Sequence, residues 1–278
     1  MEDMNHESCR ICGQTTSFTD LHFRTNGEYR LHKCDRCGTV IVDSRPTSEE
    51  LSEVYDTLFA EGGYKVYRDR HRDLLAGKLP KSPFLKGKML HKIGQLAPGR
   101  TMVEIGGGTG AFGAIVSSQG WSYADYDISQ VAVGFVRDLG LEAHCFEETD
   151  LPPIQENSVD AIVMWEVIEH IWPVHQYLVK LRDALHRNGV LAISTPNLRR
   201  KGYMNSLAHP GPNSPPIHLN FFTQEALSAT LEAAGYSRIQ FIHRRVYRSD
   251  LKLRSLIYNA KIALGIYETK TLYVLAIP

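Results

Sequence analysis

The segment at residues 101–113, TMVEIGGGTGAFG, constrains this chain more than any other stretch. An apolar run at 102–105 breaks into glycines, and the apolar spacing of a helix follows. Glycines permit positive φ in a tight turn and let the backbone approach a ligand; they stand at Gly106, Gly108 and Gly110. The segment predicts a strand, a ligand-binding loop and a helix start. The glycines also match a dinucleotide fingerprint, so by themselves they do not choose the ligand.

Two acidic residues flank this loop and narrow the choice. Glu104 precedes the first glycine by two residues, where a carboxylate would repel a phosphate but attract an α-ammonium group, directly or through water. Asp127 ends the next apolar run, where a carboxylate that accepts hydrogen bonds from ribose hydroxyls is expected. The pair favours a ligand with an ammonium group and a ribose.

A further acidic stretch follows the predicted fourth strand. Residues 159–164 are apolar or buried in pattern, as expected of a parallel strand, and Glu166, Glu169 and His170 follow at its carboxyl end. Open α/β sheets bind their ligands at that edge. The two acids around the loop and this Glu-His ending resemble the class I S-adenosylmethionine-dependent methyltransferases. The ending is very similar to that of many methyltransferases acting on sugars and quinones, and an NAD-dependent dehydrogenase is not expected to show it.

The resemblance implies a set of residues that hold S-adenosylmethionine. Glu147 would contact the adenine, since a carboxylate can accept a hydrogen bond from the exocyclic amine, and a merely solvated acidic loop is the alternative. The complete set of predicted cofactor residues is Glu104, Gly106, Gly108, Gly110, Asp127, Glu147, Trp165 and Glu166.

Two histidines are candidates for a catalytic base that removes a proton from the acceptor. His218 begins the segment His-Leu-Asn-Phe-Phe, which resembles the part of related sugar methyltransferases that carries such a histidine. In some of those relatives an acid precedes the histidine, whereas Ile217 stands here. His170 is the second candidate. Either could instead be a structural histidine with satisfied hydrogen bonds.

Four of the five cysteines form two Cys-x-x-Cys-Gly knuckles. Together the knuckles supply the four tetrahedral ligands of a structural zinc ion: Cys9, Cys12, Cys34 and Cys37. Disulfides and a redox dithiol are the alternatives; a reducing compartment disfavours the first, and the second needs only one knuckle. Residues 1–45 hold six basic and seven acidic residues, which is poorly suited to binding phosphates. The ribbon is predicted to be a scaffold or a substrate lid.

The pattern of elements predicts an α/β fold with three parts. These are a zinc-binding ribbon at 1–45, a helical lid or linker at 46–97 and an S-adenosylmethionine-dependent methyltransferase domain at 98–278. The last part is expected to be a doubly wound, mostly parallel, seven-stranded Rossmann-like sheet whose last strand, at 272–277, runs antiparallel. In the lid, residues 62–67 are predicted to interrupt the helical pattern. Tyr64 and Tyr67 could line the active site or only pack the lid.

Charge and hydropathy exclude some classes of function. Basic and acidic residues both number 31, so no global field favours nucleic acid or anionic lipid. No secretion signal or membrane-spanning run is found, and the cytoplasm is the expected compartment. The predicted function is methyl transfer to an oxygen or carbon of a sugar or other secondary metabolite, such as a nucleotide sugar or glycan. The alternatives are an RNA methyltransferase, which a basic surface joining 68–72 and 244–248 would support, and a non-catalytic protein that binds S-adenosylmethionine or a partner.

Overall fold

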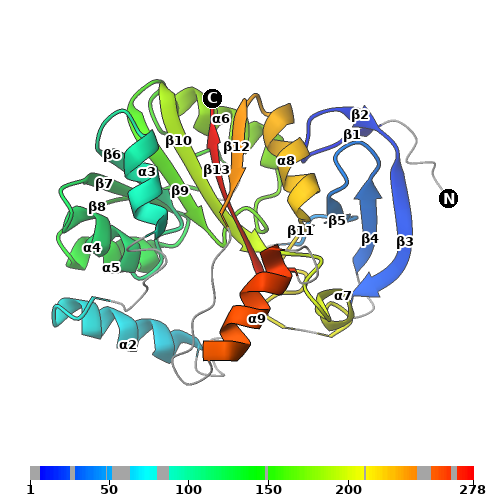
Figure 1. Ribbon diagram of the computed structural model, residues 1–278, viewed down its shortest axis with the longest axis horizontal. Helices are drawn as coiled ribbons and strands as arrows, with labels where there is room; N and C mark the ends of the chain where they lie inside the picture. The colour runs from blue at the N-terminus through cyan, green and yellow to red at the C-terminus, as the bar shows by residue number, and fades with distance from the viewer. Residues whose placement is uncertain are drawn as a thin grey trace.

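The computed structural model contains one large sheet with helices on both faces and a smaller sheet beside it (Figure 1). It describes residues 7–25, 29–47, 49–51, 63–79, 88–147, 150–209, 211–242, 252–263 and 268–278. The large sheet has seven strands in the order β12-β13-β10-β9-β6-β7-β8. Their bounds are β6 Thr101–Ile105, β7 Ser122–Asp127, β8 Glu142–Cys145, β9 Val159–Trp165, β10 Leu185–Pro196, β12 Arg238–Phe241 and β13 Thr271–Ile277.

Within this sheet only β13 runs against the other strands. It is antiparallel to both of its neighbours, β10 and β12, while β10, β9, β6, β7 and β8 are parallel to one another. This arrangement confirms the predicted mostly parallel Rossmann-like sheet with an antiparallel last strand. The chain leaves β6 toward β7 and β8 and later returns to β9 on the other side of β6. The glycine loop after β6 therefore lies at the point where the strand order reverses, which is where such sheets bind ligands.

Alternating side chains along the strands pack against helices on the two faces of the sheet. Val103 and Ile105 of β6 share a buried cluster with residues of α6 and α8, whereas Met102 lies in a second cluster with residues of α3, α4 and α5. Ser129 and Thr223 cap α5 and α8 with their side-chain oxygens. The helix bounds are α2 Gly63–Leu75, α3 Leu90–Leu96, α4 Ala111–Ser117, α5 Gln130–Asp138, α6 Val174–Ala184, α7 Tyr203–Ser206, α8 Gln224–Ala233 and α9 Lys252–Ala263.

The smaller sheet combines N-terminal strands with a strand from much later in the chain. Its order is β11-β5-β4-β3, and all neighbours are antiparallel. The bounds are β3 Phe18–Thr25, β4 Tyr29–Cys34, β5 Val40–Val42 and β11 Asn220–Phe221, and β1 Glu7–Ser8 pairs separately with β2 Thr15–Thr16. Asn220 lies opposite Ile41 and Phe221 opposite Val40. The ribbon thus shares a sheet with the segment that follows His218.

Helix α2 lies below the carboxyl ends of the large sheet in the view of Figure 1. The predicted interruption at 62–67 is wrong from residue 63 onward, because α2 begins there. Lys65 and Arg72 both pair with Asp69, at 3.2 and 2.6 Å, and pairs at this spacing support a helix. The side chain of Tyr64 and residues 244–248 lie outside the described part of the chain. None of the described helices is long and apolar enough to cross a membrane.

Candidate cofactor and acceptor site

The glycine loop between β6 and α4 depends on glycine at its first position. Gly106 has a φ of 75° and donates its N–H to the carbonyl oxygen of Tyr126 at 2.9 Å. A Cβ on Gly106 would lie 2.8 Å from Val167 Cγ2. A side chain is thus opposed both by the backbone conformation and by the neighbouring turn. The loop packs directly against the segment that follows β9.

Two aspartates of β7 accept hydrogen bonds from the loop backbone. Asp125 Oδ1 accepts from the N–H of Gly107 at 2.8 Å. Asp127 Oδ2 accepts from the N–H of Gly108 at 3.4 Å, and its Oδ1 accepts from Ser129 at 2.8 Å. Asp125 is fully buried, and its Oδ2 has no hydrogen-bond partner among the described residues. The structure therefore brings the predicted Asp127 to the loop and adds Asp125 beside it.

Glu104 is buried next to the same loop, with 2% of its surface exposed. Tyr123 Oη donates a hydrogen bond to Glu104 Oε2 at 2.5 Å. Burial, and after it the charge of Asp125, raises the pKa of Glu104 to about 8. Burial and the charge of Asp127 raise the pKa of Asp125 to about 7, and burial also raises the pKa of Asp127. A bound cation would favour the ionised form of all three carboxyl groups.

The last glycine of the fingerprint, Gly113, allows α4 to pack closely on β7. A Cβ at this position would lie 2.5 Å from Tyr123 Cζ and 2.8 Å from Tyr123 Oη. The tyrosine ring is buried and cannot move aside without disturbing its neighbours. Gly113 therefore leaves the space in which Tyr123 reaches Glu104.

The carboxyl end of β9 turns sharply at Glu166. This residue has a φ of 57°, which is uncommon for a residue with a side chain. Its N–H donates to Ser194 O at 3.0 Å, and Ser194 Oγ donates to Glu166 Oε1 at 2.7 Å. Trp165 packs edge to face on Phe112 of α4, with ring centroids 5.3 Å apart. These contacts hold Trp165 and Glu166 at the carboxyl end of β9, the strand beside β6. The glycine loop follows β6, so the two strand ends are neighbours.

Glu147 lies apart from the buried carboxyl groups, at a pocket beyond the ends of β7 and β8. Its side chain is exposed. The pocket has a volume of about 320 Å³. It is lined by Gln130, Cys145, Phe146, Glu147, Asp150, Leu151 and Pro153. A partly apolar pocket with a carboxylate on its rim is the type of surface that an adenine ring can occupy.

Tyr67 of α2 lies over the glycine loop. A Cβ on Gly108 would be 3.8 Å from Tyr67 Cε1, an ordinary van der Waals distance. The tyrosine remains 46% exposed. Helix α2 therefore places a partly exposed aromatic side chain beside the loop.

A second polar cluster begins two residues after Val167 and consists of Glu169, His170 and His218. One side-chain ligand atom of each lies within 4.8 Å of the others. His170 Nδ1 is 2.8 Å from the carbonyl oxygen of Ile217 and donates to it, since a carbonyl only accepts. The rings of His170 and His218 meet edge to face with centroids 4.7 Å apart. His218 Nδ1 lies 3.1 Å from Tyr203 Oη.

Burial sets the protonation of this cluster. Glu169 is 1% exposed; its Oε2 accepts from Thr195 Oγ1 at 3.0 Å, while its Oε1 has no partner among the described residues. Burial and the charge of Glu166 raise the pKa of Glu169 to about 8. Burial lowers the pKa of His170, and burial together with His170 lowers the pKa of His218 to about 2. Both imidazoles are thus neutral at neutral pH. The carboxyl group of Glu169 gains or loses its proton close to that pH.

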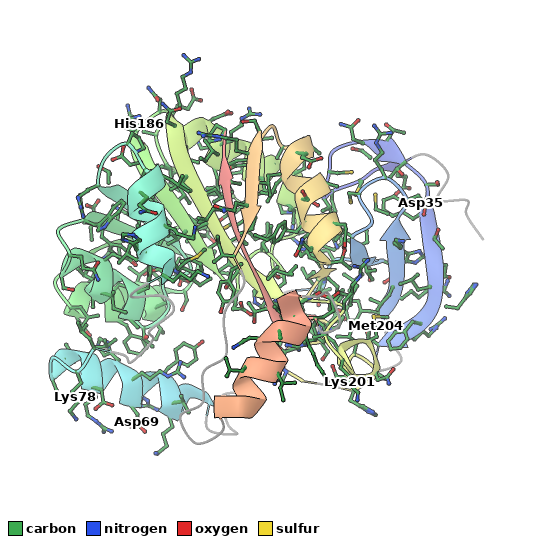
Figure 2. All side chains as sticks on the ribbon, in the orientation of Figure 1. Asp35, Asp69, Lys78, His186, Lys201 and Met204 are labelled. Atoms are coloured by element: carbon green, nitrogen blue, oxygen red, sulfur yellow. The ribbon has the colours of Figure 1, made fainter. Side chains whose placement is uncertain are left out.

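Figure 2 labels residues at opposite edges of the large sheet. Lys201 and Met204, on either side of Tyr203, lie at the lower end of the molecule in this view, whereas His186 at the start of β10 lies at the opposite end. His170 follows the carboxyl end of β9 and His218 packs against it, so both predicted histidines lie at the same edge of the sheet as the glycine loop.

The four predicted zinc ligands form a separate buried cluster in the ribbon. Each cysteine is at most 5% exposed, and none forms a disulfide. The four sulfur atoms lie within 4.8 Å of one another. The N–H groups of Ile11 and Cys37 lie 3.4 Å from the sulfur atoms of Cys9 and Cys34. Four convergent sulfurs that already receive backbone N–H groups are a donor set that fits zinc.

Three buried polar residues of the site are absent from the set predicted from the sequence. Tyr123 and Asp125 belong to the strand SYADYD, where they alternate with apolar positions and share one side with Asp127. Glu169 is identified there only as part of the Glu-His ending. Polar residues at alternate positions of a predicted core strand are the signal that would have found the first two.

Comparison with known proteins agrees with this geometry. A family model described as a methyltransferase domain matches residues 66–240, more than half of the chain. A probable S-adenosylmethionine-dependent methyltransferase of Mycolicibacterium smegmatis is 27% identical over 157 residues, which cover 52% of this chain and 55% of that protein. A ubiquinone biosynthesis O-methyltransferase of Rickettsia conorii is 26% identical over 145 residues, which cover 51% of this chain and 48% of that protein. The matched part spans about half the length of these curated relatives.

A solved structure from Thermotoga maritima shows the same fold. It is described as an S-adenosylmethionine-dependent methyltransferase and possible histamine N-methyltransferase, and it covers 81% of this chain and 98% of its own length with a TM-score of 0.54 at 16% identity. The fold, the position of the glycine loop at the switch point and the match over residues 66–240 lead to one assignment. The chain belongs to the methyltransferase domain family.

Proposed function

We propose that the protein binds S-adenosylmethionine and transfers its methyl group to an oxygen or carbon of a small-molecule acceptor, such as a sugar or another secondary metabolite. The observation that carries this proposal is the position of Val167. Its side chain meets the glycine loop at Gly106, and Glu169 and His170 follow within three residues. A donor held by the loop would face a cluster that can accept a proton. The name of the Rickettsia relative, an O-methyltransferase, is consistent with an oxygen acceptor.

The glycine loop and the carboxyl groups around it are proposed to hold the cofactor. Glu104 would attract the ammonium group, Asp127 would accept from the ribose hydroxyls, and Glu147 would accept from the adenine amine. The glycines let the backbone approach, and the strand end would close the site; these residues are Gly106, Gly108, Gly110, Trp165 and Glu166.

Methyl transfer from a sulfonium is a displacement that mainly requires positioning. The acceptor atom forms a bond to the methyl carbon while the electrons of the carbon–sulfur bond remain on sulfur, which becomes a neutral thioether. A hydroxyl or carbon acid must also lose a proton, and we assign its removal to the Glu169, His170 and His218 cluster. Glu169 would supply the acid that precedes the histidine in some related sugar methyltransferases and is replaced here by Ile217.

A structural zinc ion is proposed for the ribbon, held by the four buried cysteines Cys9, Cys12, Cys34 and Cys37. Zinc supplies a tetrahedral crosslink that fixes the two knuckles, and no step of methyl transfer is assigned to it. Free thiols at this spacing persist in a reducing compartment, which favours the cytoplasm.

Isothermal titration of the zinc-replete protein with S-adenosylmethionine, S-adenosylhomocysteine and NADH tests this function. The first two are expected to bind, and Asp127→Ala should weaken them by about tenfold or more. Asp73→Ala is the matched control, because Asp73 is an exposed aspartate of α2 that pairs with Lys78 at 3.1 Å. Binding of NADH alone would contradict the proposal. If S-adenosylmethionine binds, screening of nucleotide sugars, phenols and RNA with a labelled methyl donor would identify the acceptor.

The RNA alternative receives little support from the described part of the chain. Of the basic residues on which this alternative depends, Arg72 of α2 is paired with Asp69 at 2.6 Å, and residues 244–248 lie outside the described part of the chain. Neutralised basic residues contribute little to phosphate binding. A small-molecule acceptor is therefore the preferred class, and methylation of RNA in the screen would reverse that preference.

A further inference from the structure

Arg10 lies between the two cysteines of the first knuckle, yet its side chain reaches the methyltransferase fold. Its guanidinium carbon lies 3.9 Å from the centre of the Trp172 ring. Nη1 donates to Trp172 O at 3.2 Å and to Asn220 Oδ1 at 2.5 Å, and Nη2 donates to Leu219 O at 3.2 Å. One side chain therefore contacts two segments that are nearly fifty residues apart in the sequence.

These two segments carry the two candidate catalytic histidines. Trp172 follows His170 by two residues, and Leu219 and Asn220 directly follow His218. Arg10 thus holds the ends of both histidine-bearing segments together. The planar guanidinium presents several donors in a fixed arrangement and stacks on an aromatic ring, which a lysine ammonium cannot reproduce.

Asn220 continues this connection toward the histidines. Its Nδ2 donates to Ile168 O at 3.1 Å and to Ile171 O at 2.7 Å, so it binds the turn on both sides of His170. The backbone N–H groups of Leu219 and Asn220 donate to Glu169 O at 2.8 and 3.1 Å. A change in the position of Asn220 would therefore move the turn that carries Glu169 and His170.

The knuckle backbone fixes where Arg10 begins. The N–H of His175, at the start of α6, donates to Arg10 O at 3.0 Å. A Cβ on Gly13, directly after the knuckle, would lie 2.4 Å from the His175 ring, so the turn packs tightly on that helix. Cys9 and Cys12 flank Arg10 in the sequence, and a bound zinc ion would fix the positions of both cysteines. The fold of the knuckle thus determines the position of the guanidinium.

We propose that Arg10 is a positioning residue that transmits the zinc-bound conformation of the first knuckle to His170 and His218. Its meaning for catalysis rests on the proposed function, but its effect on the two imidazoles does not. Loss of the Arg10 contacts would alter the acceptor side of the site and leave the cofactor loop intact, because the side chain of Arg10 binds Trp172, Leu219 and Asn220 and its backbone binds His175.

The test uses the full chain with isotope-labelled histidine and compares Arg10→Met with Arg36→Met. Arg36 is the matched control, since it lies between the cysteines of the second knuckle and is exposed. Imidazole resonances of His170 and His218 are assigned with His170→Gln and His218→Gln. Both resonances are expected to shift in Arg10→Met and to stay in place in Arg36→Met, with one zinc ion retained in each variant. Arg10→Lys, which keeps the charge, should give an intermediate shift and provides the comparison if Arg10→Met fails to fold.

Removal of zinc with a chelator should displace the same two histidine resonances. Unchanged His170 and His218 resonances in a folded, zinc-bound Arg10→Met or Arg10→Lys protein would overturn the proposal. S-adenosylmethionine affinity, measured on the same samples, should stay within about twofold of the parent protein. If the parent protein does not bind S-adenosylmethionine, the proposed function is overturned instead. Failure of the Arg10 proposal and failure of the proposed function are therefore distinguishable.

Discussion

Tyr123 and Glu104 form a short hydrogen bond beneath the glycine loop, with 2.5 Å between Tyr123 Oη and Glu104 Oε2. The donor opposes the effect of burial, which alone would raise the pKa of the glutamate further. Asp125 and Asp127 add negative charge to the same region. The carboxyl groups of Glu104 and Asp125 therefore have pKa values close to neutral pH, where a bound cation would favour their ionised forms.

Cofactor affinity should depend on pH because of this arrangement. Glu104 has a pKa of about 8, and a cation favours its ionised form. The affinity for S-adenosylmethionine is expected to fall below that pH, by up to about tenfold per pH unit for one coupled proton. Glu104→Gln should bind more weakly and show a smaller pH dependence, to which Asp125 still contributes, and Tyr123→Phe should move the dependence to higher pH. Titration calorimetry in buffers of different ionisation enthalpy would detect the released proton; a parent protein without proton release would contradict the prediction.

Folding stability without cofactor should decrease as the pH rises through neutrality. Glu104 and Glu169 have pKa values of about 8 in the folded protein, far above those of an exposed glutamate. The folded state therefore holds protons that the unfolded chain releases, and the free energy of unfolding falls as the pH rises from about 5 to about 8.

The lowered pKa of His218 acts in the opposite direction, but only below about pH 6.5. Urea unfolding between about pH 6.5 and about pH 8 therefore isolates the carboxyl groups. Glu169→Gln should flatten the slope in this window, whereas Glu156→Gln, at an exposed position, should leave it unchanged. An identical slope in Glu169→Gln and the parent would show that this carboxyl group is ionised throughout.

Two helical glycines should respond in opposite ways to replacement by alanine. Gly113→Ala places a Cβ 2.5 Å from the buried Tyr123 ring, and the resulting overpacking is expected to cost about 1–3 kcal/mol of unfolding free energy. Gly134→Ala, in α5, meets no atom within 4 Å and should stabilise the protein by about 0.5–1 kcal/mol through helix propensity. Denaturant unfolding of both variants measures the two changes in unfolding free energy. Equal changes in the two variants would contradict the packing argument.

The ribbon should contain one zinc ion per chain. Cys37→Ser removes one of four buried sulfurs, so zinc content should fall and the ribbon should unfold at a lower temperature. Cys145→Ser is the control, because Cys145 lies outside the four-sulfur cluster and should retain full zinc content. Metal analysis by mass spectrometry together with a thermal melt provides the measurement. Full zinc content in Cys37→Ser would show that this sulfur is not a ligand.

Much of the fold could be predicted because local sequence determines it. The apolar runs around Val103 and Ile162 have the length and composition of buried parallel strands, and the glycines require a tight turn between β6 and α4. The two cysteine knuckles are likewise local patterns. The break predicted at 62–67 failed because the ion pairs at Asp69 and the packing of α2 outweigh the low helix propensity of glycine.

The connections between distant segments could not be predicted. Nothing in the spacing of Arg10 shows that its guanidinium reaches Leu219 and Asn220, because that contact joins positions more than two hundred residues apart. Glu169 likewise reaches His218 only through the pairing of the two segments in space. Side-chain contacts of this kind follow from tertiary packing, for which a single sequence contains no periodic signal.

The pairing of β11 with β5 limits how this chain can be inherited or rearranged. A ribbon that formed hydrogen bonds only within itself could be exchanged between relatives as an independent unit. Here a ribbon from another protein would have to match the register of Asn220 and Phe221, and a chain without residues 1–45 would expose the edge of β11 to pairing with other molecules. The two parts are therefore expected to change together over evolution.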